Sequence, residues 1–409
     1  MRVAITSNGP GEFSGWVRPL VAALYRLAPE TDVTLFFVPD DYATGREPDV
    51  ARALFPQARV VPAKTYVRFA LGARIADLPE RVDVVQYLGG DLLHAARVHA
   101  RLGGAAFAYK FARRREMKTF ARAFAVDAKN EDEIVRAGFP RERIDVVGNL
   151  AIDGALGEAA GAFPLTVGQP AIAPDGVLVM PGTRKHEVAN LVPFFVQSAL
   201  RLRERRPEIP IAFAISPFTT TEELAAAFAA GGHRNVWGAR GTVVPFEGGL
   251  AFAADDGSAP FPIVRDAMRY APHARLVVTL PGTKCIELAA LGVPAIVCVP
   301  LNSPEAVVVN GPLQYIDRIP FAGTLLKREI VIRVDARFAL TAQPNIDTGE
   351  LLMPELRGTL MPAETSRSIE RYYDDGPARA SASARLRDLY AAQAGAAERM
   401  ARALLERGA

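Results

Sequence analysis

Short runs of consecutive apolar residues alternate along this chain with longer segments whose apolar residues recur at helical spacing. In the first part of the chain, the runs predicted as strands are 2–7, 32–39, 82–89, 105–110, 123–128 and 143–149. Segments between them, such as 17–28, place their apolar residues on one helical face. Short apolar strands separated by helices are typical of a parallel sheet that is covered on both faces.

A second series of the same kind follows a break at 155–175, which is rich in Gly, Ala and Pro and lacks an apolar period. The predicted elements of this series are strands at 176–182 and 209–217, helices at 187–206 and 221–231, and a strand–turn–helix–strand unit at 275–300. An Ala-rich amphipathic helix is predicted over 381–407. The pattern indicates an α/β plan used twice.

We therefore expect two Rossmann-like, doubly wound parallel-sheet domains that face a cleft. Their predicted bounds are 1–158 for the first domain and 172–380 for the second, and the C-terminal segment 381–409 is expected to pack back on the first domain. In such sheets, ligands bind beyond the carboxyl ends of the strands, where glycine turns lead into helices.

Composition fits a globular protein with a substantial core, because 50% of the 409 residues are hydrophobic and 23% are charged. The formal net charge of +3 is compatible with an anionic substrate or an anionic membrane surface and requires neither. Two cysteines cannot form a disulfide framework, which favours a reducing compartment. With no basic and apolar leader pattern and no apolar run of spanning length, we expect a cytoplasmic protein or one that lies on a membrane surface.

The most informative motif is "LPGTKCIE" at 280–287, where a predicted strand turns into a predicted helix. Gly282 lets a ligand approach the backbone, and the free N–H groups around Thr283 suit phosphate oxygens. Glu287 is then placed to accept hydrogen bonds from ribose hydroxyls. The alternative is an ordinary strand–helix turn in which Glu287 belongs to a capping box.

"MPGTRKHE" at 180–187 has the same shape and includes Gly182, Thr183 and Arg184. A guanidinium at this position suits bidentate contact with a diphosphate. The alternative is a solvated basic helix start, which is unfavourable beside the positive end of the helix dipole.

Two carboxylates follow predicted strands in the first domain. Asp91 lies in "GGDLLH" and Glu12 lies in the opening turn "SNGPGEFSG", and either could act as a general base. The commoner role of an aspartate at such a place is to cap a helix, and Ser14 could do the same for the next helix.

A basic segment at 109–118 carries Arg113, Arg114 and Arg115 and could hold anionic lipid headgroups, although a solvated basic face explains it equally well. No nucleic-acid module accompanies it, so no nucleic-acid partner is expected. The sequence has no His and Cys pattern with metal-ligand spacing, and its first turn is not the dinucleotide fingerprint G-x-G-x-x-G.

Taken together, these motifs resemble the lipid-A-disaccharide synthase family, glycosyltransferases of the two-Rossmann-domain GT-B type. The segments that carry the resemblance are "GEFSG" (11–15), "VGNLAID" (147–153), "MPGTRKHEV" (180–188), "PGTKCIELAALGVPAIV" (281–297) and "QPNIDTGELLMPEL" (343–356). They occur in family order over most of the chain. Trp16 stands where the family has Asp, and Lys284 and Cys285 stand where it has small residues.

The resemblance implies inverting transfer of an N-acyl-glucosamine type sugar from a UDP-sugar to a lipid-linked acceptor. It places Gly182, Thr183, Arg184, Gly282, Thr283, Glu287, Asn345 and Glu355 on the nucleotide-sugar side, and Ser14, Trp16 and Arg113–Arg115 on the acceptor or lipid side. Asp91, or otherwise Glu12, would be the general base.

The resemblance also implies a UDP-sugar and a lipid acceptor as partners, peripheral association with the inner (cytoplasmic) membrane, and no metal or other cofactor. Two alternatives remain open at this point. One is an enzyme similar to UDP-N-acetylglucosamine 2-epimerase, and the other is a non-catalytic protein that binds a nucleotide-sugar or a lipid.

Overall fold

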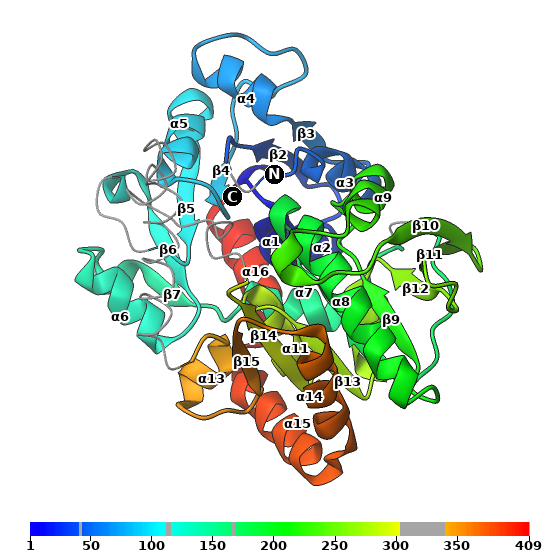
Figure 1. The fold of residues 1–409 in the computed structure, drawn as a ribbon. Coiled ribbons are helices and arrows are strands. Elements are labelled where there is room, and N and C mark those ends of the chain that lie inside the picture. Colours follow the sequence, from blue (N-terminus) through cyan, green and yellow to red (C-terminus); the bar gives the residue numbers. More distant parts are fainter. Residues whose placement is uncertain (41–42, 112–115, 166–167, 303–339, 409) are drawn as a thin grey trace, which may run out of the picture. The chain divides into compact units, whose positions relative to one another are not determined.

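The chain divides into two compact units, each with its own sheet and core. The computed structural model describes all residues except 41–42, 112–115, 166–167, 303–339 and 409. Unit 1 comprises Met1–Thr166 and Tyr390–Ala409, and unit 2 comprises Val167–Leu389. The predicted α/β class with two largely parallel sheets is confirmed (Figure 1).

The sheet of unit 1 is parallel throughout its described strands. In spatial order the strands are β3 (Arg59–Val61), β2 (Asp32–Phe37), β1 (Arg2–Ser7), β4 (Val84–Tyr87), β5 (Ala105–Tyr109), β6 (Arg122–Ala125) and β7 (Ile144–Val146). Ile5 lies between Leu35 and Gln86 in the register of the central strands. The strands that follow β1 are added first on one side of it and then, from β4 onward, on the other, so the winding reverses between β1 and β4.

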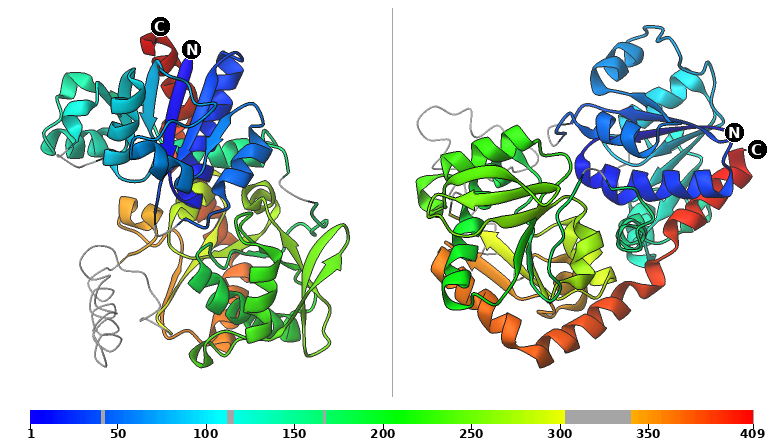
Figure 2. Two further views of the ribbon diagram at one scale, coloured as in Figure 1. Left: turned by 90° about the horizontal axis from the view of Figure 1, so that it is seen from above. Right: turned by 90° about the vertical axis from the view of Figure 1, so that its right-hand side faces the viewer.

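Helices follow these strands as the apolar spacing predicts. Unit 1 contains α1 (Pro10–Glu12), a π-helical turn (Phe13–Val17), α2 (Arg18–Leu27), α3 (Glu47–Leu54), α4 (Ala63–Ala70), α5 (Leu92–Leu102), α6 (Ala128–Arg136), α7 (Leu150–Ala159) and α16 (Ala396–Gly408). α16 packs on α2 and α7, and Figure 2 shows α2 and α16 side by side. The start of α16 is held by Asp153 of α7, whose two carboxylate oxygens each accept a 2.6 Å hydrogen bond, one from the Gly395 amide and the other from the Ala397 amide.

Unit 2 combines a parallel sheet with an antiparallel edge. Its spatial order is β10 (Gly241–Phe246), β11 (Gly249–Ala254), β12 (Phe261–Val264), β9 (Ile211–Ala214), β8 (Val177–Val179), β13 (Leu276–Thr279), β14 (Ala295–Pro300) and β15 (Glu355–Gly358). β10, β11 and β12 pair antiparallel, which the sequence analysis did not anticipate. Glu247 and Gly248, both at positive φ, form the two-residue turn between β10 and β11, and this is the turn geometry that hairpins prefer.

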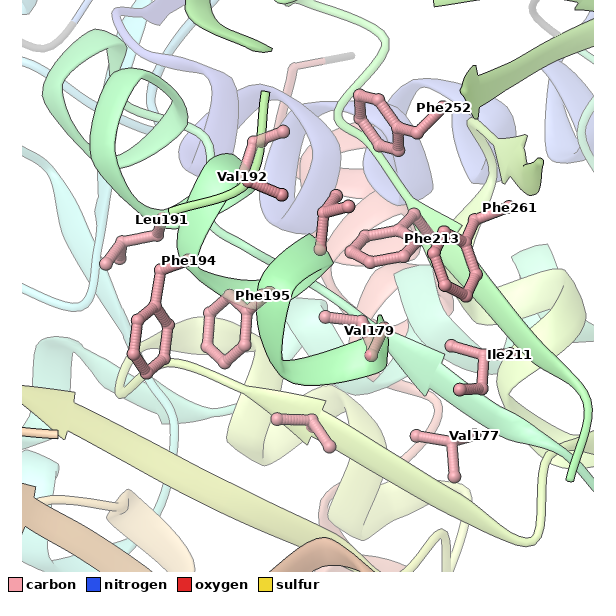
Figure 3. Close-up of a cluster of buried hydrophobic side chains, with 14 of the residues drawn as sticks. Val177, Val179, Leu191, Val192, Phe194, Phe195, Ile211, Phe213, Phe252 and Phe261 are labelled. Atoms are coloured by element: carbon pink, nitrogen blue, oxygen red, sulfur yellow. The ribbon is translucent and has the colours of Figure 1, made fainter. Parts of the chain in front are cut away.

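Aromatic side chains fill the core of unit 2 (Figure 3). The Phe213 ring of β9 packs edge-on against the Phe252 ring of β11, with 5.2 Å between the ring centres. Its ring centre lies 5.7 Å from that of Phe261 of β12. The remaining helices of this unit are α8 (Lys185–Arg205), α9 (Thr221–Ala230), α10 (Ala267–Tyr270), α11 (Thr283–Ala290), α13 (Gln343–Thr348), α14 (Pro362–Asp374) and α15 (Gly376–Tyr390). α8 runs through Pro193 without a break and buries Phe194 and Phe195 against this core.

The C-terminal segment differs from the single helix predicted over 381–407. α15 lies in unit 2 as far as Leu389, its last residue Tyr390 already belongs to unit 1, and α16 begins at Ala396 in unit 1. Gly395, at a φ of +80°, separates the two helices in a conformation that suits glycine. Among the described residues, no helix has both the length and the hydropathy needed to cross a membrane.

Candidate functional site

The first candidate site lies in unit 1 at the carboxyl ends of β1 and β4, where the strand order reverses. Open α/β sheets bind their ligands at such a switch point. β1 leads into the turn that carries Asn8 and Glu12, and β4 leads into Gly89 and Gly90. The two turns touch, because a Cβ added to Gly89 would lie 2.3 Å from Asn8 Oδ1 and 3.2 Å from Glu12 Cγ. Only glycine fits at this position.

Asp91 caps α5 in this site. Its Oδ1 accepts a 3.0 Å hydrogen bond from the Leu93 amide, so the commoner of the two roles expected for this aspartate is present. Capping takes up one of the two carboxylate oxygens. Glu12 is half-buried at the end of α1, against the Gly89 turn. Both candidate bases therefore belong to the same edge of the sheet.

Several buried polar atoms at this edge have no protein partner among the described residues. They are Ser7 Oγ and Asn8 Oδ1 at the end of β1, and Gln86 Oε1 on β4. Asn8 is only 6% exposed and donates its Nδ2 hydrogen to Asp40 at 3.0 Å, which fixes the orientation of its amide. An unpartnered buried acceptor costs about 1–3 kcal/mol and calls for a water molecule or a ligand donor.

A histidine that the sequence analysis did not select lies beside the same turn. His94, on α5, makes a 2.9 Å hydrogen bond through Nδ1 with the Tyr66 hydroxyl of α4, and the two rings pack edge-on. Burial lowers the pKa of His94, against the opposing charges of Asp91 and Asp40, and burial raises the pKa of Tyr66 to about 12. The only sequence signal was the place of His94 three residues after Asp91, since Tyr66 comes from a distant segment.

Ser14 and Trp16 lie in the π-helical turn, a feature that often accompanies functional sites. The Trp16 ring packs edge-on against Tyr109 at 5.5 Å, and Lys110 Nζ lies 5.7 Å from the Trp16 ring centre. The Ser14 carbonyl approaches α7, where a Cβ on Gly154 would lie 3.2 Å from it. Arg113, Arg114 and Arg115 lie outside the described residues, as does most of the segment 301–343.

The second candidate site lies in unit 2 at the carboxyl ends of β8 and β13, the switch point of the second sheet. The two glycine turns predicted to bind a nucleotide follow these two strands. They adjoin each other, because a Cβ on Gly182 would lie 2.9 Å from Leu280 Cδ1. The structure therefore brings "MPGTRKHE" and "LPGTKCIE" together.

The first of these turns is closed by a carboxylate of its own helix. Glu187 Oε2 accepts hydrogen bonds from the amides of Thr183 at 2.9 Å and Arg184 at 3.0 Å. The Arg184 guanidinium is 3.5 Å from Glu187 Oε1, and about half of its side chain is exposed. The amides of Thr183 and Arg184 are thus already hydrogen-bonded, so what Arg184 can still offer a ligand is the positive charge of its side chain.

The second turn is open. Gly282 has a φ of +148°, no atom lies within 4 Å of the position of a Cβ on it, and Gly282 and Thr283 are exposed. Within the described part of the chain, the amides of Thr283 and Lys284 have no acceptor. Glu287 is buried and contacts Lys284 Nζ at 2.5 Å instead. These two amides and the Lys284 ammonium give the start of α11 the donors and the positive charge that suit an anion.

Asn345 and Glu355, which the resemblance places on the nucleotide side, are both buried and paired within unit 2. Glu355 Oε1 accepts hydrogen bonds of 2.9 Å from the amides of Thr341 and Ala342 and from Asn345 Nδ2. Burial alone would raise the pKa of Glu355, but these hydrogen bonds outweigh it and hold the pKa below the ordinary value. The structure shows both side chains fixing the start of α13, and direct contact with a nucleotide would require one of these bonds to open.

In the part of the chain that the structure describes, no three His, Cys, Asp or Glu side chains are grouped to hold a metal ion. Both cysteines are free and buried.

Comparisons with known proteins identify the fold. No family model matches this chain. A lipid-A-disaccharide synthase of Geobacter sulfurreducens is 26% identical over 219 residues, which is 53% of this chain and only 43% of that protein. The solved structure of UDP-GlcNAc 2-epimerase from Neisseria meningitidis, bound to UDP-GlcNAc, covers 99% of this chain and 100% of its own at 11% identity, with a TM-score of 0.53.

A glycosyltransferase is similar to the same extent. The solved glycotransferase of kitacinnamycin covers 99% of this chain and 98% of its own at 14% identity, with a TM-score of 0.50. These likenesses show that the chain has the two-domain fold shared by such transferases and epimerases, which confirms the fold class expected from the sequence.

Proposed function

We propose that this protein is a glycosyltransferase that moves an N-acyl-glucosamine type sugar from a UDP-sugar to a lipid-linked acceptor with inversion. The observation that carries the proposal is the open start of α11 at the switch point of unit 2. Further support comes from the partial match to a lipid-A-disaccharide synthase, from the five motifs in family order and from the UDP-GlcNAc bound by a structural neighbour.

On the donor side, the diphosphate of the UDP-sugar would accept hydrogen bonds from the Thr283 and Lys284 amides. The Lys284 ammonium, which is about one-third exposed, would add a charge-assisted contact, and Arg184 would add positive charge from the adjoining turn. Preorganised donors of this kind stabilise the negative charge that develops on the leaving UDP. We infer that the transfer needs no metal or other cofactor.

On the acceptor side, a hydroxyl of the lipid-linked acceptor would bind at the switch point of unit 1. As its oxygen bonds to the anomeric carbon, the bond from that carbon to the donor phosphate oxygen breaks, and UDP departs with the electron pair. A base must take the hydroxyl proton, and Asp91 and Glu12 are the carboxylates at this edge of the sheet. Ser14 and Trp16 would lie beside the acceptor, with Arg113–Arg115 as lipid contacts.

A second candidate function is that of an enzyme similar to UDP-GlcNAc 2-epimerase, because solved proteins of that name share the fold over nearly the whole chain. A protein that binds the nucleotide-sugar without turnover is a third. Both would use the same open start of α11. They differ in product: the epimerase changes the UDP-sugar without a lipid, and the binder changes nothing.

The test is to incubate the protein with a panel of UDP-sugars, with and without a membrane lipid extract, and to measure UDP release and the products. We expect release that depends on lipid. Lys284→Ala should raise KM for the UDP-sugar at least about tenfold, as loss of a hydrogen bond to a charged group does. Lys185→Ala is the matched control. Lys185 is the first residue of α8, after the turn whose amides Glu187 occupies, and its Nζ lies 3.3 Å from Glu223 Oε1.

UDP release that is independent of lipid, with an altered UDP-sugar as product, would replace the transferase by the epimerase. Tight UDP binding without any turnover would leave only the binding protein. Equal KM values for the two lysine variants would contradict the proposal that the start of α11 binds the UDP-sugar.

We also propose peripheral association with an anionic membrane surface through α4. Its outward face carries Lys64, Val67 and Arg68, and Leu71, the residue that follows its last turn, is 81% exposed. Apolar and basic side chains on one helical face favour the membrane interface.

In sedimentation with phosphatidylglycerol vesicles, Leu71→Glu should abolish binding. Leu351→Glu, at an exposed leucine of unit 2, should leave binding unchanged. Equal binding by both variants would contradict a role for α4.

A further inference from the structure

The Gly89–Gly90 turn in unit 1 is flanked by polar groups on two sides. On one side lies the unpartnered Oδ1 of Asn8, 2.3 Å from where a Cβ on Gly89 would be. On the other side lies the ring of His94, whose Cδ2 is 3.7 Å from where a Cβ on Gly90 would be. The Cδ2 side of the imidazole, away from Nδ1, therefore lies toward the turn.

The opposite edge of the imidazole contacts the Tyr66 hydroxyl. The Tyr66 hydroxyl oxygen lies 2.9 Å from His94 Nδ1 and 3.5 Å from the His94 backbone carbonyl. In the Nδ1–H tautomer both contacts are hydrogen bonds, because Nδ1–H donates to the Tyr66 oxygen and the Tyr66 O–H donates to the carbonyl. In that tautomer Nε2 carries a free lone pair and can accept a proton.

The charges around His94 suit a group that is neutral at rest and gains a proton during turnover. Burial favours the neutral ring and lowers the pKa of His94. Asp91 at the start of α5 and Asp40 after β2 are the carboxylates whose charges act on His94, and both favour the imidazolium once it forms. Arg97, further along α5, acts on Tyr66. Among the described residues Nε2 has no protein partner.

We propose that His94 is the general base of the unit 1 site, with Tyr66 as the positioning residue that holds it in the Nδ1–H tautomer. The ligand at this site is an alcohol. It is the acceptor hydroxyl of the proposed function, and this inference rests on that function. Its oxygen bonds to the anomeric carbon, its proton passes to His94 Nε2, and UDP takes the electron pair of the broken bond. Asn8 Oδ1 accepts a hydrogen bond from a neighbouring hydroxyl or amide of the same ligand.

This assignment changes the role proposed for Asp91. Asp91 already caps α5 through Oδ1, and its charge then stabilises the His94 imidazolium instead of taking the proton directly. A histidine base stays available at neutral pH because its ordinary pKa of 6.5 is lowered further here.

The experiment combines kinetics with the nitrogen spectrum of the full chain labelled with 15N-histidine. In the wild type, kcat should fall on the acid side with a midpoint below 6.5, where His94 gains a proton. His94→Gln should lower kcat by about 100-fold or more, remove this acid limb and leave KM for the UDP-sugar unchanged. Tyr66→Phe should lower kcat by roughly tenfold because part of the His94 population changes tautomer. His99→Gln, on the same helix, is the matched control and should behave as wild type.

The spectrum decides the inference independently of activity. The five histidines give five sets of signals, and the set missing in His94→Gln belongs to His94. An Nδ1–H tautomer at neutral pH supports the inference, and an Nε2–H tautomer overturns it. A kcat for His94→Gln within threefold of wild type, with the acid limb retained, overturns it as well. If wild-type protein releases UDP with no acceptor, the proposed function fails, while the tautomer still decides whether His94 is poised as a base.

Discussion

Gly182 lies where the two glycine turns of unit 2 meet, and replacing it with alanine tests their packing. An alanine Cβ would lie 2.5 Å from Glu187 Oε2, 2.8 Å from Glu187 Cβ and 2.9 Å from Leu280 Cδ1. Glu187 Cβ is fixed to the backbone of α8, so side-chain rotation alone cannot relieve the overlap. Overpacking of this kind costs about 1–3 kcal/mol, and the φ of +105° adds about 1 kcal/mol or more of backbone strain. We expect Gly182→Ala to lower the free energy of unfolding of unit 2 by about 3 kcal/mol.

Gly282→Ala, in the turn that precedes α11, is the matched control. Gly282 also has a positive φ, +148°, but a Cβ on it would meet no atom within 4 Å. This variant should therefore show the backbone strain alone, about 1 kcal/mol.

Each unit contains one tryptophan, so Trp237 fluorescence in a Trp16→Phe background reports on unit 2 in a urea titration of the full chain. Equal free energies of unfolding for the two alanine variants, within about 0.5 kcal/mol, would refute the packing argument, since additive effects are resolved at about that level.

Three further predictions concern buried polar groups. Glu355→Gln should lower the free energy of unfolding by about 2 kcal/mol at pH 7. Because the folded-state pKa of Glu355 lies below 4.5, its contribution is present above pH 4.5 and is lost as the pH falls through the folded value, so the wild-type advantage in urea titrations should shrink below pH 4.5. Asp153→Ala removes the acceptor of two amides at the start of α16 and should cost about 2 kcal/mol, seen as faster hydrogen exchange in α16; unchanged exchange would contradict this docking. Burial raises the pKa of Cys285 and Cys298 to about 12, so neither should react with a thiol reagent at pH 8 until the protein is denatured.

The apolar pattern predicted most of the parallel strands of both sheets, but it missed β3, β12 and β15, which also pair parallel with a neighbouring strand. Strands such as Arg2–Ser7 are buried over nearly their whole length, and a continuous apolar run of that length is what a doubly covered sheet requires. The antiparallel edge of unit 2 was missed because β10 and β11 are partly exposed, each begins with a glycine and β10 contains Pro245, so neither looks like a buried strand. Its signal was the Glu247–Gly248 turn, which only backbone geometry identifies as a hairpin.

The sequence also placed the glycine turns at the right edge of each sheet, because parallel strands end together. It could not foresee which polar groups are already satisfied. Asn345 and Glu355 belong to one hydrogen-bond network whose other members come from Thr341, Ala342 and Met353, and only the fold brings these together. The Tyr66–His94 pair joins two helices in the same way, so no spacing along the chain predicts it.

The two glycine turns show how a small shift in helix start changes chemistry. Glu187 and Glu287 each follow a Pro-Gly-Thr turn at the same spacing. α8 begins at Lys185, so Glu187 is its third residue and reaches back to the amides of the turn, as a capping-box glutamate does. α11 begins at Thr283, so Glu287 is its fifth residue, too far along to cap, and it contacts Lys284 one turn back. The amides that Glu187 occupies in the first turn are therefore left open in the second, and this is why a phosphate is expected at α11 although the two sequences look alike.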